Sequence, residues 1–182
     1  YKRQHIEFPS QQTHVLSGLP GTSRKDKDYF PLYVGNHILG GSGLVSLLFE
    51  EVREKRGLAY SAYSYFSPLF RKGPFTMGLQ TRNDQTSQAV DVMINTLQDF
   101  ITQGPTEAEL AAAKKNITGG FVMRFDTNSK LTAYVAMIGF YQLPLDYLDT
   151  FPQKVEAVSV EAIKQAFQRR VNPELLQTIT VG

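Results

Sequence analysis

The chain of 182 residues contains no cysteine, only three histidines and no long apolar run. Without cysteine it cannot form a disulfide framework, use a thiol nucleophile or bind zinc through thiolates. No segment approaches the roughly eighteen apolar residues that a membrane-spanning helix needs, so we expect no membrane span. Cysteine-free chains occur in oxidising and reducing compartments alike. The compartment therefore stays open, with the periplasm or cell envelope of a bacterium slightly preferred to the cytoplasm.

The three histidines do not form a zinc-binding motif. A zinc hydrolase needs two histidines and a carboxylate on the metal, which on one helix reads H-x-x-E-H or its reverse. The positions three and four residues after His5, His14 and His37 carry neither a carboxylate nor a second imidazole. We therefore predict that this chain binds no metal and that these side chains are solvated or locally hydrogen-bonded.

Two other catalytic motifs are also missing. Ser42 has a glycine two residues before it, but Gly43 follows it directly, so it does not lie in a G-x-S-x-G nucleophile elbow. The same glycine-rich segment lacks the downstream Lys-Ser/Thr pair of a phosphate-binding P-loop. The sequence thus predicts no catalytic residue on this chain alone.

The composition is that of one globular unit. Hydrophobic residues make up 42% of the chain, enough for one core over residues 1–182. Charged residues make up 20% with a net charge of +2 and both signs interspersed, which excludes a disordered tail or a nucleic-acid arm. Because the sequence begins abruptly with Tyr-Lys-Arg-Gln, we expect a fragment of a longer protein.

The spacing of apolar residues predicts an α+β fold. Strands are expected over residues 12–19, 60–67, 75–81 and 175–181. Helices are expected over residues 29–39, 44–56, 87–101, 111–123, 130–141 and 160–171, with Thr106 and Glu109 as a capping box before the fourth. This order indicates a two-layer arrangement, in which helices pack on one face of a mostly antiparallel sheet of about four strands.

The most informative segment runs from the glycine-rich stretch Gly40, Gly41, Ser42 and Gly43 to Tyr60. The helix after the glycines is expected to end at Gly57, and a strand then opens near Tyr60. Arg53 and Tyr60 are thereby placed seven residues apart across a helix-to-strand turn. A guanidinium and a phenol are both hydrogen-bond donors, which suit an oxyanion or a substrate peptide carbonyl.

Each of these residues also has a purely structural interpretation. Arg53, in the last turn of a helix, can interact with the helix dipole and pair with Glu50. Tyr60 can pack its ring and hydrogen-bond its hydroxyl within the fold. The glycines can form a tight turn between helices, or a backbone that an extended peptide approaches closely.

Residues 39–60 resemble the segment Leu-Gly-Gly…Arg-x-x-x-Gly-Leu-x-Tyr in the non-zinc half of pitrilysin-type (insulinase-like) zinc metallopeptidases. The resemblance extends to residues 73–81, similar to the family's second hairpin strand, and to residues 106–123, similar to its long helix. It implies the two-layer α+β metallohydrolase domain of that family, of the C-terminal type.

The resemblance also implies partners. In this family two homologous halves, on one chain or two, enclose a chamber, and only one half bears zinc. Arg53 and Tyr60 would contact peptide substrate near that metal. Residues 40–43 resemble, in a shorter form, the glycine-rich loop of the non-catalytic subunit of the mitochondrial processing peptidase. The isolated domain would bind no cofactor, be inactive, and form a weak homodimer or pair with the zinc-bearing half.

Two alternatives remain. The chain could be a family member kept as a structural or chaperone-like subunit without activity, although the presence of both Arg53 and Tyr60 favours a role on substrate. It could also be a single-stranded RNA-binding sheet, since the aromatic residues of the predicted strand at 60–67 superficially resemble an RNP motif. Pro74 and Met77 break that pattern, so we expect no nucleic-acid partner.

Overall fold

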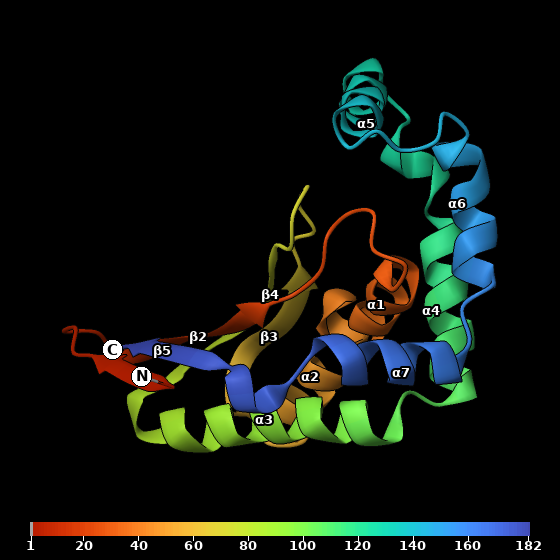
Figure 1. Cartoon of the computed structure of the whole chain (residues 1–182). Coiled ribbons are helices and arrows are strands. Elements are labelled where there is room, and N and C mark those ends of the chain that lie inside the picture. Colours follow the sequence, from red (N-terminus) through yellow and green to blue (C-terminus); the bar gives the residue numbers. More distant parts are fainter. Residues whose placement is uncertain (1) are drawn as a thin grey trace.

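The computed structural model describes residues 2–182 and contains one five-stranded sheet (Figure 1). From edge to edge the strands are β1 (Arg3–Ile6), β5 (Gln177–Val181), β2 (Gln12–Pro20), β4 (Pro74–Arg82) and β3 (Ala59–Phe66). Strands β5, β2, β4 and β3 pair antiparallel, and β1 pairs parallel with β5. The predicted α+β class and the mostly antiparallel sheet are confirmed.

Seven α-helices are described, two of them continued by π-helical turns. They are α1 (Tyr29–Asn36), α2 (Leu47–Phe49), α3 (Thr86–Gln103), α4 (Glu107–Gly119), α5 (Asn128–Phe140), α6 (Tyr147–Glu156) and α7 (Val160–Arg170). The π-helical turns His37–Gly41 and Glu50–Glu54 follow α1 and α2 directly. Short 3-10 turns cover Gly43–Val45, Asn83–Gln85, Val122–Arg124 and Pro173–Leu175.

The core lies between one face of the sheet and the helices. Alternate residues of β2 are buried, namely Thr13, Val15, Ser17 and Leu19. This period of two directs one face of the strand towards α3 and α7. The side chains of Phe75, Met77 and Phe167 are fully buried there, and each such side chain stabilises the fold by roughly 1.5–3 kcal/mol. The predicted packing of helices on one face is confirmed.

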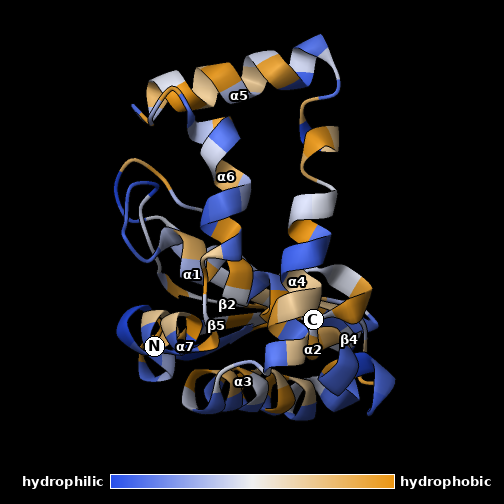
Figure 2. Ribbon diagram, turned by 90° about the vertical axis from the view of Figure 1, so that its right-hand side faces the viewer, coloured by the Kyte–Doolittle hydropathy of each residue, from blue (hydrophilic) through white to orange (hydrophobic). Residues whose placement is uncertain are grey.

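Three further helices, α4, α5 and α6, extend away from the sheet. In Figure 1, α4 and α6 run side by side away from the body, and α5 lies across their far ends, as Figure 2 shows from another direction. The capping box that begins α4 is present, because the Thr106 amide donates to Glu109 Oε2 at 2.7 Å and the Glu109 amide donates to Thr106 Oγ1 at 3.2 Å.

Helix α1, which leads into the glycine-rich segment, is held at its start by an ion-pair cluster. Asp28 accepts hydrogen bonds from Arg169 at 2.8 Å and from Arg170 at 2.9 Å, both at the end of α7. Arg170 also donates to Asp26 at 2.7 Å. The Asp28 side chain is almost completely buried, so these contacts fix the first turn of α1 on the core.

Several sequence predictions were wrong at their boundaries or by omission. The helix predicted from Leu44 begins only at Leu47, because Ser46 Oγ caps it by accepting from the Phe49 amide. Leu44 lies in the preceding 3-10 turn with 71% of its surface exposed. The predicted helix 111–123 ends at Gly119, and the next three-residue turn is 3-10.

Two elements were missed altogether. All four residues of β1 are exposed, so its sequence carries no alternation that would reveal a strand. Helix α6 contains Pro152, which normally argues against a helix interior. The buried positions Tyr147, Phe151 and Val155 nevertheless recur every four residues and hold it against the core.

Candidate functional site

Arg53 and Tyr60 lie in direct contact. The Arg53 guanidinium carbon is 4.8 Å from the centroid of the Tyr60 ring and 4.9 Å from that of Phe49. The backbone reverses at Gly57, whose φ of 61° is left-handed and suits glycine. The Gly57 and Leu58 amides donate to the carbonyls of Arg53 and Val52, which ends the helix where the sequence predicted.

The hydrogen-bonding groups of this pair remain available. Tyr60 is 81% exposed and the Arg53 side chain 36% exposed. Glu50, the partner that a structural role would give Arg53, pairs instead with Lys55 at 3.0 Å. Glu54 lies 4.0 Å from Arg53, beyond hydrogen-bonding range. Within residues 2–182, neither the guanidinium nor the phenol has a hydrogen-bonding partner.

Stacking on two rings orients the guanidinium without consuming its N–H groups. A cation over an aromatic face is held by the ring quadrupole, which contributes about 0.5–1 kcal/mol at an exposed site. The N–H groups at the edge of the guanidinium and the Tyr60 hydroxyl can therefore both donate to an acceptor outside this chain. This geometry suits a carbonyl oxygen or a developing oxyanion.

The glycine-rich segment is built mainly by packing against β3. Gly40 lies in the π-helical turn, and a Cβ there would lie 2.5 Å from both the amide nitrogen and the Oγ of Ser64. Only glycine permits that approach. Gly43 has a φ of 64° and open space around it, so its backbone conformation is what requires glycine. Ser42 follows the turn and donates its amide to the His37 carbonyl at 3.1 Å.

A cleft of about 550 Å³ opens between α1, the glycine-rich segment and β3. Gly40, Gly41 and Gly43 line it, together with Arg24, Arg124, His37 and five tyrosine or phenylalanine side chains: Tyr29, Tyr33, Tyr63, Tyr65 and Phe66. Its described lining contains no Asp or Glu. Burial, followed by the nearby Arg124 charge, lowers the pKa of His37, although a hydrogen bond with Asn116 opposes that shift.

Sequence reasoning missed the two arginines of this cleft. Arg24 lies in the loop before α1, and Arg124 in the 3-10 turn after α4. They are separated by 100 positions and belong to no motif, so only the fold reveals that they share a cleft.

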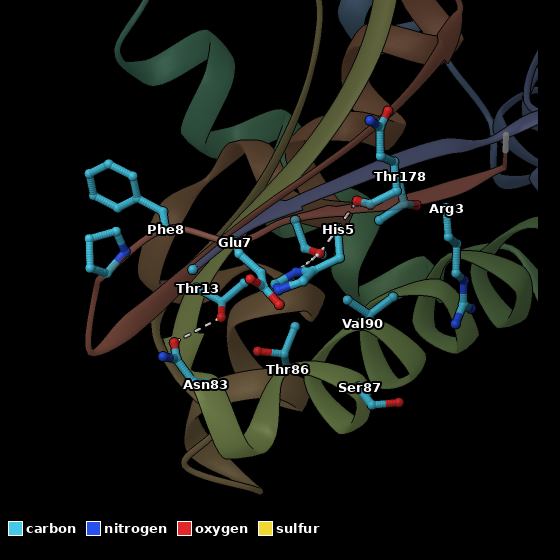
Figure 3. Close-up of a pocket in the computed structure, with 14 residues that line it drawn as sticks. Arg3, His5, Glu7, Phe8, Thr13, Asn83, Thr86, Ser87, Val90 and Thr178 are labelled. Carbon is cyan, nitrogen blue, oxygen red and sulfur yellow. Dashed lines mark hydrogen bonds between the residues drawn. The ribbon is translucent and has the colours of Figure 1, made fainter.

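A larger hollow, of about 1100 Å³, lies elsewhere, between α3 and the β1–β5 end of the sheet (Figure 3). Its polar side chains bond to one another. His5 Nδ1 lies 2.9 Å from Thr180 Oγ1, and Thr13 Oγ1 donates to Asn83 at 2.9 Å. Arg3 reaches Asp91 at 3.4 Å. This pocket contains none of the predicted site residues.

Within residues 2–182, no group of three or more histidine, aspartate or glutamate side chains could hold a metal ion. His5 bonds to Thr180, His14 is exposed on β2, and His37 is partly buried beside the cleft. In the same range, no helix has both the length and the hydropathy to cross a bilayer.

Comparison with known proteins identifies the family. The model of the peptidase M16 inactive domain matches residues 1–117. The chain belongs to the peptidase M16 inactive domain family. The resemblance to pitrilysin-type peptidases is thereby confirmed, and this chain is a non-catalytic domain of a zinc-protease-like protein.

Individual relatives agree with this assignment. This M16 inactive domain is 36% identical over 122 residues to an uncharacterized zinc protease of Streptomyces coelicolor, covering 67% of this chain and 26% of the relative. It is 33% identical over 158 residues to a non-peptidase homolog of Helicobacter pylori, covering 85% and 36%. The crystal structure of a peptidase M16 inactive domain from Pseudomonas fluorescens superposes with a TM-score of 0.93 at 36% identity, covering 99% of this chain and 43% of that one.

Proposed function

We propose that this domain binds peptide substrate and completes the active site of a zinc-bearing homologous half through Arg53 and Tyr60. The observation that carries the proposal is the exposed, stacked pair whose donors have no acceptor within residues 2–182. An arginine that served only the helix end would pair with Glu50, yet Lys55 occupies that carboxylate. Donors held in a fixed orientation suit an acceptor supplied by a substrate.

The metal belongs to the other half in this proposal. No ligand set for zinc exists within residues 2–182, so we derive no step on a metal held by this chain. The chain spans 26% and 36% of the two curated relatives and 43% of the solved structure. Those relatives have room for a homologous half, which could lie on the same longer chain or on a separate subunit.

An apolar surface on α5 supports association with such a half. Along this helix only Ile138 is buried, and hydrophobic residues follow its length in Figure 2. The exposed apolar side chains on and beside α5 are Val122, Met123, Leu131, Val135, Phe140 and Leu145. Apolar patches of this kind mark interaction surfaces. In the absence of the homologous half, the same surface would support a weak homodimer.

The second candidate function is that of a structural subunit without catalysis. The relation to a non-peptidase homolog favours it, because a family member of that name shares 33% identity with this chain. The two candidates differ in whether Tyr60 touches peptide.

A photo-crosslinking experiment separates them. The full-length protein would carry a photoreactive phenylalanine at position 60 or, as a matched control, at Phe8, an exposed aromatic residue beside the hollow of about 1100 Å³. We expect unfolded polypeptide or peptide substrate to be captured at position 60 and not at position 8. Equal capture at both positions, or none at position 60, would overturn the proposal and leave the structural role.

A further inference from the structure

Two guanidinium groups in the cleft beside the glycine-rich segment have no carboxylate partner. Arg24 and Arg124 both line this cleft and also a neighbouring hollow of about 310 Å³, so they lie close to each other. Within residues 2–182 neither forms an ion pair, whereas Arg169 and Arg170 at the end of α7 are paired with Asp28. We refer to Arg24, Arg124 and the surrounding cleft as the arginine cleft.

Tyrosine hydroxyls orient these arginines without neutralising them. Arg24 donates to the hydroxyls of Tyr29 at 2.6 Å and Tyr147 at 3.1 Å, and Arg124 donates to Tyr33 at 2.7 Å. The rings of Tyr29 and Tyr33 are stacked with centroids 6.0 Å apart, which connects the two arginines through one rigid unit. Burial raises the pKa of Tyr29 and of Tyr147, so these phenols stay neutral and supply no negative charge.

Among the described residues, the cleft contains a hydrogen-bond donor without an acceptor and two positive charges without a counter-ion. Arg24 Nε is buried and has no hydrogen-bonding partner in the described chain. A buried donor without an acceptor is rare in folded proteins and costs roughly 1–3 kcal/mol. Partly buried positive charges without a counter-ion are also unfavourable, since desolvation is not offset by attraction. An anionic ligand would supply the missing counter-charge, and the acid-free lining of the cleft offers it no repulsion.

We propose that the arginine cleft binds a side-chain carboxylate of the substrate, so that this domain selects acidic peptides. The inference rests on the proposed peptide-binding function and names the substrate class. Arginine suits a carboxylate because its planar N–H groups can form two parallel hydrogen bonds with the two oxygens.

The edge strand β3 relates this cleft to Arg53 and Tyr60. Tyr60 is the second residue of the strand, while Tyr65, five residues later, lines the cleft. At about 3.3 Å per residue, the two positions are separated by roughly 16 Å. A peptide running beside β3 in extended form covers that distance in about five residues. The acidic residue is therefore expected about five positions from the carbonyl that Arg53 and Tyr60 contact.

The test compares peptides that differ only in whether one side chain is a carboxylate or the neutral amide of the same shape. Twelve-residue peptides would carry Asp at successive positions, each matched by the Asn peptide, and binding to the full-length protein would be followed by NMR at the His37 ring. Residues 1–182 contain three histidines, and of these His37 alone lines the cleft. We expect the best Asp peptide to bind about tenfold or more tightly than its Asn match, the scale of one charge-assisted hydrogen bond.

Variants assign the effect to the cleft. Arg124→Gln should abolish the difference between Asp and Asn peptides, and Arg124→Lys should restore part of it. Arg82→Gln, which removes an equal charge from an exposed arginine paired with Asp84, should leave the difference unchanged. Melting temperatures would accompany each variant, and Arg124→Lys keeps the test valid if Arg124→Gln folds poorly.

Three results would overturn the inference. They are equal binding of Asp and Asn peptides, loss of the difference in Arg82→Gln as well, and saturation by inorganic phosphate with no preference among peptides. If the preference is absent but crosslinking at position 60 persists, only this inference fails. If crosslinking is also absent, the proposed function itself fails.

Discussion

Asn36 and Ser64 exchange two hydrogen bonds across the boundary between α1 and β3. The Asn36 amide donates to the Ser64 carbonyl at 3.1 Å, and the Ser64 hydroxyl donates to Asn36 Oδ1 at 2.8 Å. Ser64 is buried, and the close approach of Gly40 to its backbone occurs at the same place. The end of α1 is thus fastened to the edge strand where the arginine cleft and the glycine-rich segment meet.

Ser64→Ala should destabilise the fold through this contact. The substitution leaves Asn36 Oδ1 without its donor in a partly buried position, and the free energy of unfolding should fall by about 1–3 kcal/mol. Ser61→Ala, at an exposed position of the same strand, is the matched control and should change it by less than about 0.5 kcal/mol. Urea denaturation measures both, and equal effects would contradict the role of the contact.

Arg53→Ala and Tyr60→Phe should act on substrate turnover and hardly on folding. If each side chain donates to the substrate carbonyl or oxyanion, either variant should lower turnover by the assembled protease by roughly 10²–10³. The double variant should lose less than the product of the two effects, because the residues act as a unit. Peptide cleavage and melting temperatures would be recorded together. Full activity, or losses that follow a fall in melting temperature, would return both residues to a structural role.

Two alanine substitutions distinguish the glycines. Gly40→Ala places a methyl group against Ser64, and such overpacking should lower stability by about 1–3 kcal/mol. Gly43→Ala meets no atom within 4 Å, so only its left-handed backbone is strained, at about 1 kcal/mol. Gly43→Asn should recover part of that loss, because asparagine tolerates this conformation. If Gly40→Ala proves the milder of the two, close packing does not explain Gly40.

Asp28→Asn should remove a stabilising contribution that depends on pH. Burial alone would raise the pKa of Asp28, but hydrogen bonds and charges from Arg169 and Arg170 outweigh it and lower the pKa below its ordinary value of 3.8. The contribution is therefore complete at neutral pH and disappears as the pH falls through the lowered value. At pH 7 the free energy of unfolding of the variant should be about 3 kcal/mol lower than that of the wild type. This value is the lower end of the range measured when one partner of a buried ion pair is removed.

The pH dependence checks this assignment. The difference between wild type and Asp28→Asn should narrow as the pH falls below about 4. Asp84→Asn removes the charge from an exposed ion pair with Arg82, so its stability should be almost that of the wild type both at pH 7 and below about pH 4. A constant difference over the whole acid range would show that Asp28 acts through something other than its charge.

Val135→Asp should weaken association without affecting the core. Val135 is 60% exposed on α5, so a charge there should leave the melting temperature of the isolated domain nearly unchanged. It should reduce self-association and pairing with the homologous half, measured by sedimentation. Asp99→Ala, on the far side at α3, serves as the control. Unaltered association in Val135→Asp would exclude the α5 surface.

The sequence predicted those parts of the fold that carry a local signal. Alternation in β2, the capping box of Thr106 and Glu109, and the left-handed Gly57 each follow from neighbouring residues. Strand β1 was not predictable, because its pairing with β5 depends on residues about 175 positions away and its side chains stay exposed. Pro152 concealed α6, which tertiary packing stabilises despite the proline.

The same distinction applies to the site. Arg53 and Tyr60 are seven residues apart, so a helix end and a turn were sufficient to predict their proximity. The stacking geometry was not predictable, because both segments were read as ordinary α-helix and strand, whereas Arg53 lies in a π-helical turn. Arg24 and Arg124 come together only through the packing of α1 against α4, which no local pattern records.

The contact between Arg53 and Tyr60 depends on the number of residues in the π-helical turn Glu50–Glu54. In it the Lys55 amide donates to the Glu50 carbonyl at 2.9 Å, one residue further back than in an α-helix. Removing one residue from this turn would let an ordinary α-helical ladder form. Because each residue of an α-helix advances the side chains by about 100°, everything before the deletion would rotate by that angle relative to Gly57 and β3. In a relative that has the same side chains but one residue fewer in this turn, the side chains before the deletion would point in a different direction relative to β3.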